Sequence, residues 1–277
     1  MTGRRPTALR TAAAGRVLAV LAVVVLLASG PLASGPTYAA ERPAPAVLPG
    51  QRLWVQLSGS LRIPAGTDAV ELDGEDTPAR TVRRLRAYGL TVVCYVSAGS
   101  WERYRDDAGD FPRSVLGRRL DGWPDERWLD VRRLDVLLPL IERRVRTCAD
   151  KGFRGVEFDN VDGYANRTGF PITRRDQLRY DRALAALARR HGLSPGLKNS
   201  PGLVADLVAS YDWALVEECV TYDECARYRP FVRAAKSVTV LEYGDVAFAS
   251  VCRAAARLGV SAELRRRDLG PWVRRCR

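Results

Sequence analysis

Apolar residues along the chain fall into two alternating patterns. Short, nearly continuous apolar runs are separated by longer stretches in which apolar residues recur every three or four positions. The runs are typical of strands buried on both faces of a parallel sheet, and the longer stretches are typical of amphipathic helices. The predicted strands are residues 53–59, 69–74, 91–99, 155–160, 193–200, 213–219 and 237–244, with an eighth at 260–265.

Helical patterns lie between many of these strands, and several of them close on glycine, as helix C-termini often do. They cover residues 77–89, 134–152, 174–192, 224–236 and 248–259. Strands that alternate with helices indicate an α/β fold with a parallel sheet, either a barrel or an open doubly wound sheet. No glycine-rich phosphate-binding motif follows any predicted strand, so we expect no nucleotide and no other cofactor.

The N-terminal 40 residues have the pattern of a secretory signal peptide. A leader with four arginines precedes an apolar run at 17–28 and a small-residue cleavage site at 37–40. The run is shorter than the roughly 20 residues that span a bilayer. We therefore predict a secreted, extracellular protein without stable membrane insertion after cleavage, and we expect a monomer.

The mature chain has a suitable length for one barrel. Removing residues 1–40 from the 277 leaves about 237, close to the roughly 250 residues of a (β/α)8 barrel. A proline-rich lead-in at 41–50 has no periodicity. We predict a single (β/α)8 domain of the TIM-barrel type over residues 51–277, in which segment 100–133 forms an elaborated βα loop.

The positive charge of the chain does not point to nucleic acid. The formal net charge is +12, and it falls to about +8 without the four arginines of the leader. The remaining excess is mostly arginine scattered over helical segments, without one basic block or a nucleic-acid reading motif. We interpret it as a solvated surface.

The cysteines and the single histidine restrict the chemistry. Six cysteines in an exported chain suggest disulfides. The short separation favours Cys219–Cys225, and Cys94–Cys148 with Cys252–Cys276 would complete one of several possible pairings. No CxxC spacing exists and His191 is the only histidine, so zinc binding and histidine-dependent hydrolysis have little support. Acid–base chemistry must rest largely on carboxylates.

Many carboxylates stand at the ends of the predicted strands. The C-terminal ends of parallel strands share one rim of a barrel, where barrel enzymes carry their active sites. We therefore expect these acids to be neighbours in space, and three of them lie in GVEFDNVDGY (155–164). The set is Asp73, Glu157, Asp159, Asp162, Glu217, Glu218 and Glu242.

Aromatic residues are predicted on the same rim, although about half of them should pack in the core. Flat rings with polar edges suit stacking on sugars, and carboxylates with aromatics favour glycoside hydrolysis over other hydrolysis. The residues are Trp54, Tyr95, Trp101, Trp123, Trp128, Tyr164, Tyr222 and Tyr243.

A series of sequence blocks resembles one known family. From about Leu53 to the C-terminus, the chain is similar to the glycoside hydrolase family 114 domain, whose members are (β/α)8 barrels that include endo-α-1,4-polygalactosaminidases. The blocks are WVQLSG, ELDGEDTP, VVCYVSAGSWERYR, FPRSVLG, WLDVR, GFRGVEFDNVDGYANRTGFP, DQLRY, GLKNS, EECVTYDEC and LEYGD. The proposed catalytic pair of the family lies in its E-x-D-N and E-[QE]-C blocks, which match Asp159 and Glu217.

The resemblance implies a mechanism with two carboxylates. Asp159 would attack the anomeric carbon, and Glu217 would protonate the leaving oxygen and then activate water; the reverse assignment stays open. A separation of about 5–5.5 Å between the carboxyl groups would mean retention, and about 6.5–9.5 Å would mean inversion. We expect retention.

Further rim residues are expected to bind substrate. Glu157 shares a strand face with Asp159, so it could partner Lys198 or substitute as a catalytic group. Asp162 could cap a loop or bind sugar. The predicted substrate-binding set is Asp73, Tyr95, Trp101, Glu157, Asp162, Tyr164, Lys198, Asn199, Glu218, Glu242 and Tyr243.

The resemblance points to an α-linked, galactosamine-containing polysaccharide as the partner. A cationic polymer would be repelled at long range by the net charge, but acids on the rim could reverse the local field. An N-acetylated or neutral α-linked substrate stays open. The alternatives are a same-fold hydrolase of another glycan, a non-catalytic carbohydrate-binding barrel, and a Ca²⁺-type metal-binding protein, which the absence of a DxDxDG loop disfavours, so we expect no metal.

Overall fold

The structure is a computed structural model that describes residues 43–244 and 246–276. The predicted signal peptide (1–40) and residues 41–42 of the lead-in lie outside the described residues. The rest of the lead-in packs against the domain, since Ala46 and Val47 are buried. The backbone N–H of Ala46 donates to Ser194 Oγ over 3.0 Å, which ties this segment to the barrel.

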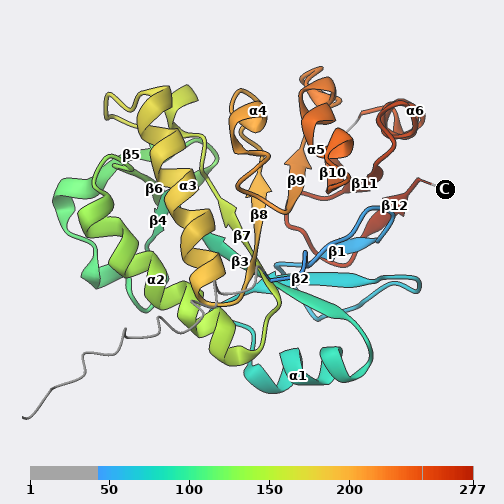
Figure 1. Cartoon of the computed structure of the whole chain (residues 1–277), viewed down its shortest axis with the longest axis horizontal. Coiled ribbons are helices and arrows are strands. Elements are labelled where there is room, and N and C mark those ends of the chain that lie inside the picture. Colours follow the sequence, from blue (N-terminus) through green and yellow to red (C-terminus); the bar gives the residue numbers. More distant parts are fainter. Residues whose placement is uncertain (1–42, 245, 277) are drawn as a thin grey trace, which may run out of the picture. The chain divides into compact units, whose positions relative to one another are not determined.

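One curled sheet forms the centre of the domain (Figure 1). Its order is β1-β2-β3-β7-β8-β9-β10-β11-β12, and the strands from β1 to β11 pair in parallel. Their bounds are β1 Leu53–Val55, β2 Ala69–Asp73, β3 Thr91–Ser97, β7 Gly155–Asp159, β8 Ser194–Lys198, β9 Trp213–Glu217, β10 Ser237–Tyr243 and β11 Ser261–Arg265. Every predicted strand is present, which confirms the single-domain, barrel-type α/β fold.

The helices follow the strands and cover the outside of the sheet (Figure 1). The α-helices are α1 Ala79–Ala87, α2 Leu134–Lys151, α3 Arg174–Arg190, α4 Val204–Leu207, α5 Arg229–Arg233 and α6 Phe248–Leu258. Short 3-10 helices are η1 Ala108–Asp110, η2 Arg113–Val115, η3 Gly163–Ala165 and η4 Cys225–Tyr228. α3 begins with a capping box in which Thr173 and Asp176 each accept a backbone N–H.

The helix predicted at 224–236 is shorter than expected, covers residues 225–233, and is not one continuous α-helix. The segment contains η4 followed by the short helix α5. Pro230 stands at the start of α5, and a proline has no N–H to continue the hydrogen-bond ladder of a preceding helix. The apolar spacing alone could not show this break.

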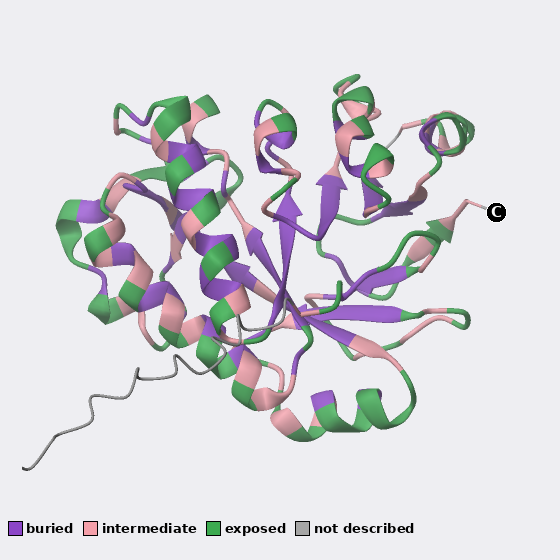
Figure 2. Cartoon of the chain, viewed as in Figure 1, coloured by how far each residue is buried: buried purple, intermediate pink, exposed green. Residues whose placement is uncertain are grey.

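Two apolar clusters pack on opposite faces of the sheet, because side chains alternate along each strand. The larger lies between the sheet and the helices and includes Val96, Phe158, Leu137 and Leu184. The smaller lines the inside of the curl. It contains Ala46, Val47, Leu53, Val55, Ala69, Val93, Trp213, Leu215, Leu241, Tyr243 and Leu269. The central strands are almost entirely buried (Figure 2), and the inner cluster forms an apolar floor under their C-terminal ends.

The two ends of the parallel series meet through side chains and a short added strand. β12 (Val273–Arg275) pairs antiparallel with β11, an element that the apolar pattern did not predict. Arg265 is buried, lies 3.9 Å from the centre of the Trp54 ring, and donates to the carbonyl of Val55 on β1 over 2.7 Å. The N–H of Leu57 donates to Leu269 O over 3.1 Å. These contacts connect β1 to the β11–β12 end of the sheet.

The predicted elaborated loop at 100–133 contains a small sheet of its own. Its order is β4-β6-β5, and its strands pair antiparallel. This sheet is separate from the central sheet and lies between β3 and α2 in the chain. The bounds are β4 Ser100–Glu102, β5 Leu116–Leu120 and β6 Trp123–Leu129.

Three disulfides connect the elements. Cys94–Cys148 joins β3 to α2, Cys219–Cys225 closes the loop after β9, and Cys252–Cys276 joins α6 to the segment after β12. The predicted set of pairs is confirmed. Within the described residues, no helix is both long enough and apolar enough to cross a membrane.

Candidate active site

Three charged side chains meet at the C-terminal ends of neighbouring strands. Asp159 ends β7, Lys198 ends β8 and Glu217 ends β9. The ammonium of Lys198 lies 3.1 Å from Asp159 Oδ1 and 3.2 Å from Glu217 Oε2. We call these residues the Lys198 cluster. Parallel pairing brings together residues that are 58 positions apart at their extremes, as 159 and 217 show.

The two carboxylates of the cluster are partly exposed to solvent, and the lysine is buried. The side chain of Lys198 is 6% exposed, whereas those of Asp159 and Glu217 are 18% and 22% exposed. Burial alone would lower the pKa of Lys198, but the carboxylates of Asp159 and Glu217 raise it well above its usual value. Lys198 is therefore a fixed cation between two reachable carboxylates.

Asp159 accepts two further hydrogen bonds. The hydroxyl of Tyr95 on β3 donates to Asp159 Oδ2 over 3.0 Å, and the N–H of Asn160 donates to Oδ1 over 2.8 Å. Burial and then the charge of Asp159 raise the pKa of Tyr95, so this phenol stays protonated and able to donate. Three donors in total stabilise the negative charge of Asp159.

Glu217 is positioned by residues of β10 and of the turn after β8. The hydroxyl of Tyr243 on β10 donates to Glu217 Oε1. The side-chain oxygen of Asn199 accepts the backbone N–H of Glu217 over 2.8 Å, which fixes the strand end rather than the carboxylate. Burial and the charge of Glu217 raise the pKa of Tyr243, so it also remains a donor.

The backbone turns sharply directly after each of these strand ends. Asn160 (φ 61°), Asn199 (φ 47°), Ser200 (φ 56°) and Glu218 (φ 56°) adopt the left-handed conformation without being glycine. Asparagine tolerates this region better than most residues, and glutamate tolerates it poorly. The turns aim the preceding side chains into the barrel mouth while the chain leaves it.

Two glutamates lie below the Lys198 cluster on the inner face of the sheet. Glu71 on β2 and Glu157 on β7 have no measurable exposure, and none of their carboxyl oxygens has a hydrogen-bond partner among the described residues. We call them the buried glutamate pair. Glu157 Oε1 lies 3.8 Å from Lys198 Nζ, so the predicted proximity of Glu157 and Lys198 is observed. Glu71 was not among the predicted site residues.

A second group of charged residues lies between β2, the segment after β4, and α2. Arg105 forms bidentate contacts with Asp73 and with Glu102, at distances from 2.7 to 2.9 Å. Arg144 forms a bidentate contact with Asp107 and lies 3.3 Å from Glu102. We call these five residues the Arg105 cluster. Every carboxylate oxygen in it accepts at least one hydrogen bond.

The arginines set the ionisation of this cluster. Burial would raise the pKa of Asp73, but the hydrogen bonds and charge of Arg105 hold it below its usual value. The same balance, with Arg144 as the donor, lowers the pKa of Asp107. Asp73, predicted to bind substrate, thus has both of its oxygens occupied by a neighbouring side chain.

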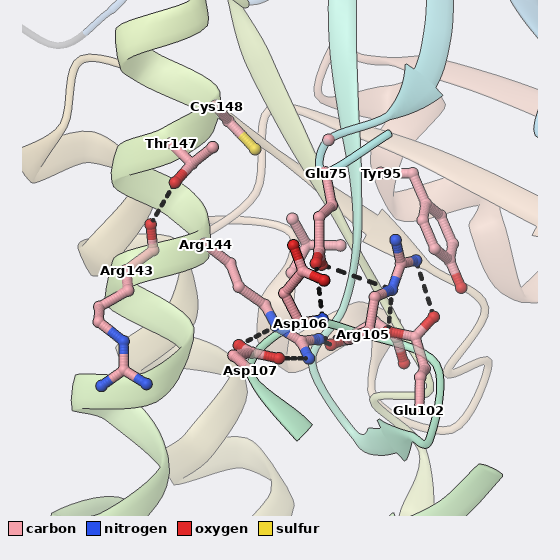
Figure 3. Close-up of a pocket in the computed structure, with 13 residues that line it drawn as sticks. Glu75, Tyr95, Glu102, Arg105, Asp106, Asp107, Arg143, Arg144, Thr147 and Cys148 are labelled. Atoms are coloured by element: carbon pink, nitrogen blue, oxygen red, sulfur yellow. Dashed lines mark hydrogen bonds and ion pairs between the residues drawn. The ribbon is translucent and has the colours of Figure 1, made fainter. Parts of the chain in front are cut away.

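A pocket of about 290 Å³ lies against the Arg105 cluster. Figure 3 shows Glu102 beside Arg105 and Asp107 beside Arg144 along its wall. Tyr95 lines this pocket, but Asp159, Lys198 and Glu217 do not. The Lys198 cluster, where one lysine contacts two acids, is therefore the candidate site, because two arginines bind both oxygens of each carboxylate in the Arg105 cluster.

Glu218 and Glu242 hold the loop that follows β9. Arg267 lies 2.6 Å from Glu218. Glu242 is buried and accepts the N–H of Val220 over 2.7 Å and the hydroxyl of Thr221 over 2.9 Å. Both acids lie near Glu217 in the fold, but the structure gives each of them a partner in the protein.

The remaining predicted residues lie around the rim. Asp162 is half-buried, and burial together with the charge of Asp159 raises its pKa to about 6. Tyr164 is half-buried and packs against Gly202. A Cβ added at Gly202 would lie 2.3 Å from the phenol oxygen of Tyr164. Trp101 donates through Nε1 to Ala108 O over 3.0 Å, which anchors it in the segment after β4.

A polar chain that was not predicted connects Asp159 to the small sheet. Asn160 Nδ2 donates to Ser97 Oγ and Ser100 Oγ over 3.0 and 3.1 Å, and Ser100 Oγ donates to Glu126 over 2.7 Å. Burial raises the pKa of Glu126 to about 7. Ser97 and Ser100 stand at the end of the strand predicted at 91–99, and Asn160 stands in the E-x-D-N block. Among the described residues, no group of three or more His, Cys, Asp or Glu side chains is arranged to hold a metal ion.

The sequence matches one protein family, and the fold is similar to that of solved structures. The model of glycoside-hydrolase family GH114 matches residues 35–277. The structure of Aspergillus fumigatus Ega3 in complex with galactosamine is similar, with a TM-score of 0.80 and 29% identity over 86% of this chain and 100% of that one. The glycoside hydrolase domain of PelA from Pseudomonas aeruginosa shares the fold, with a TM-score of 0.64 and 15% identity over 80% of this chain and 97% of that one. No curated protein matches the sequence.

Proposed function

Because the chain belongs to glycoside-hydrolase family GH114 and is therefore a glycosidase, we propose that it is a secreted, endo-acting enzyme that cleaves α-linked galactosamine-containing polysaccharide. The observation that carries the proposal is the contact of one lysine with two partly exposed carboxylates, Asp159 and Glu217, at the rim of the barrel. This is the pair of groups that glycoside hydrolysis requires.

The different surroundings of the two carboxylates support their roles. Asp159 has three hydrogen-bond donors, from Lys198, Tyr95 and Asn160, which stabilise it as an anion and suit a nucleophile. Glu217 accepts one hydrogen bond, from Tyr243, forms an ion pair with Lys198, and has the more exposed side chain. Glu217 delivers a proton to the leaving oxygen and then removes one from the attacking water.

The shared lysine supports retention of configuration. Asp159 Oδ1 and Glu217 Oε2 both contact Lys198 Nζ, so these oxygens are separated by no more than 3.1 Å plus 3.2 Å. Retaining enzymes place their carboxyl groups about 5–5.5 Å apart, whereas inverting enzymes need about 6.5–9.5 Å to admit a water. The upper limit set by Lys198 favours direct attack by Asp159.

Amino sugars suit the charge at the rim. Three acids, Asp159, Glu217 and the nearby Asp162, lie around Lys198, so this part of the rim favours a positively charged sugar over the rest of the basic surface. The similar protein Ega3 has been solved with galactosamine. A polymer with free amines is the substrate we propose to test first. The leader and three disulfides support export.

Two conservative substitutions test this function. Asp159→Asn and Glu217→Gln should each lower the release of oligosaccharides from a deacetylated galactosamine polymer by roughly 10³-fold or more, because each removes one of the two reacting groups. The measurement is product formation by mass spectrometry, with thermal unfolding to show that each variant is folded.

The matched control is Asp135→Asn, which neutralises an exposed carboxylate on α2. It should retain full activity. Wild-type activity in either Asp159→Asn or Glu217→Gln would contradict the assignment. Testing N-acetylated and neutral α-linked polymers in parallel identifies the glycan, and the anomer of the first product, followed by NMR, reports retention.

A further inference from the structure

The buried glutamate pair differs from every other acid near the proposed catalytic centre. Glu71 and Glu157 are fully buried, yet the four oxygens of their carboxyl groups have no hydrogen-bond partner among the described residues. Directly above, Asp159 accepts hydrogen bonds from Tyr95, Asn160 and Lys198, and Glu217 accepts one from Tyr243 and forms an ion pair with Lys198. An ionised carboxylate without donors is much costlier to bury than a neutral carboxyl group.

The balance of charge also favours neutral, protonated carboxyl groups at Glu71 and Glu157. Glu71, Glu157, Asp159 and Glu217 face one cation, Lys198. If all four acids were ionised, three negative charges would remain uncompensated inside the barrel. Tyr95, Asn160 and Tyr243 donate hydrogen bonds to the two upper acids, whereas no described residue donates to the two lower ones, so protons on the lower pair remove the charge that has no donor.

We propose that Glu71 and Glu157 form a neutral, proton-holding carboxyl pair beneath the active site, and that this pair positions Lys198 between Asp159 and Glu217. Both glutamates are positioning residues, since they act on the reaction through Lys198 and do not reach the rim. The positioning part rests on the function proposed above, whereas the protonation part does not.

The strand register places the two glutamates near one another. Both lie on the inner face, on β2 and β7, and these strands flank β3, where Val93 is opposite Glu71 and Tyr95 is opposite Glu157. Burial raises the pKa of Glu71 to about 8, and burial together with the charge of Glu71 raises the pKa of Glu157. The titratable groups that face the pair are Tyr95 on β3, Asp159 on β7, Lys198 on β8, Glu217 on β9 and Tyr243 on β10.

The position of Lys198 depends on the pair remaining neutral. Its ammonium lies 3.8 Å from Glu157 Oε1, beyond hydrogen-bond distance, and 3.1–3.2 Å from the two carboxylates above. If Glu157 were ionised, it would compete for the same ammonium and draw it down from the rim. Loss of the proton in mildly alkaline solution would therefore reduce turnover without changing the groups that react.

The test uses Glu71→Gln, Glu157→Gln and the double variant of the full mature chain. We expect the infrared carbonyl band of protonated carboxyl groups to lose intensity in each single variant at neutral pH. We also expect the wild-type melting temperature to fall as pH rises from about 6 to about 9, and the double variant to fall markedly less, because its neutral amides have no proton to release.

Turnover on the galactosamine polymer tests the positioning role. In Glu157→Gln, kcat at about pH 6 should stay within about threefold of wild type with KM unchanged, while the alkaline limb of kcat moves up by about one pH unit. Asp181→Asn is the matched control. Asp181 on α3 is also fully buried with one unpartnered oxygen, so its substitution should remove its own infrared contribution and leave the pH profile of kcat unchanged.

The outcomes separate the two proposals. Unchanged carboxyl bands in both single variants, or a double variant as pH-sensitive as wild type, would overturn the neutral pair. Loss of the bands with an unmoved alkaline limb would overturn the positioning role. An inactive wild type would count against the proposed substrate, while the infrared and melting experiments would still decide the protonation of the pair.

Discussion

The Lys198 cluster and the Arg105 cluster are both built from buried or half-buried acids around cations, at neighbouring strand ends. In the Arg105 cluster, two arginines occupy every oxygen of three carboxylates. In the Lys198 cluster, one lysine contacts two acids whose surfaces stay partly exposed, above two more acids that have no hydrogen-bond partner among the described residues. Pairing of every carboxylate with an arginine at two points makes a rigid support, whereas under the proposed function the Lys198 cluster has to exchange protons and bind substrate.

The difference between the cations is part of this contrast. Arg105 and Arg144 present planar forks that match carboxylates at two points, whereas the Lys198 ammonium contacts Asp159 and Glu217 as a point charge. A fork holds its partners in one geometry. The Lys198 ammonium contacts one oxygen of each carboxylate, and the other oxygen of each accepts a hydrogen bond from the hydroxyl of Tyr95 or Tyr243.

The largest effect should follow from removing the lysine. We expect Lys198→Met to lower kcat by about 100-fold or more, because Asp159 and Glu217 then repel one another without a cation between them. Lys198→Arg keeps the charge and should recover part of the loss. Steady-state kinetics on a galactosamine polymer measures both, and a Lys198→Met variant with wild-type kcat would make the two clusters functionally alike.

A smaller effect, and one of a different kind, should follow from removing the arginine. Arg105→Met leaves Asp73 and Glu102 without their main partner, and we expect the free energy of unfolding to fall by about 3 kcal/mol. The kcat of the folded fraction should change little. Chemical denaturation and active-site titration separate the two quantities, and a large fall in kcat without loss of stability would place Arg105 in the catalytic centre.

The smallest predicted effect is on the pH dependence of stability. The lowered pKa of Asp73 means that its stabilising contribution is present above its unfolded pKa near 3.8 and is lost as pH falls below that value. Asp73→Asn should therefore lose about 1 kcal/mol at neutral pH and almost nothing at about pH 2.

The stabilising contribution of Glu71 depends on pH in the opposite direction. Its raised pKa means that its contribution is complete below about 4.5 and is lost as pH rises through about 8. Glu71→Gln should leave the acid limb of stability unchanged. Melting temperatures across the pH range measure both limbs, and limbs of the same sign in the two variants would remove the electrostatic distinction between the clusters.

Much of the fold could be predicted because the central strands are buried on both faces. Segments such as TVVCYVS on β3 and WALVE on β9 show nearly continuous apolar residues, and their order between helices implies parallel pairing. The small sheet was not predicted because β5 (LGRRL) and β6 (WPDERWL) are partly exposed and carry charges. β12 (VRR) is too short and too basic to show any strand period.

The site could be predicted in part for a similar reason. Strand ends identified Asp159, Lys198 and Glu217, and family-like blocks singled out the two acids. Glu71 escaped notice because a carboxylate in the middle of AVELD resembles an ordinary exposed strand position. The partner of Asp73 could not be predicted either, since Arg105 is 32 residues away and stands in a segment without periodicity.

The left-handed turns after β7, β8 and β9 restrict how the candidate site can be redesigned. Asn160, Asn199 and Glu218 directly follow Asp159, Lys198 and Glu217, so a combinatorial library that randomises the candidate site will include them first. Most substitutions there would misdirect a reactive group through the backbone, whatever the new side chain offers to a sugar. Libraries limited to glycine, asparagine, aspartate and the native residue at these three codons should contain a larger fraction of active clones.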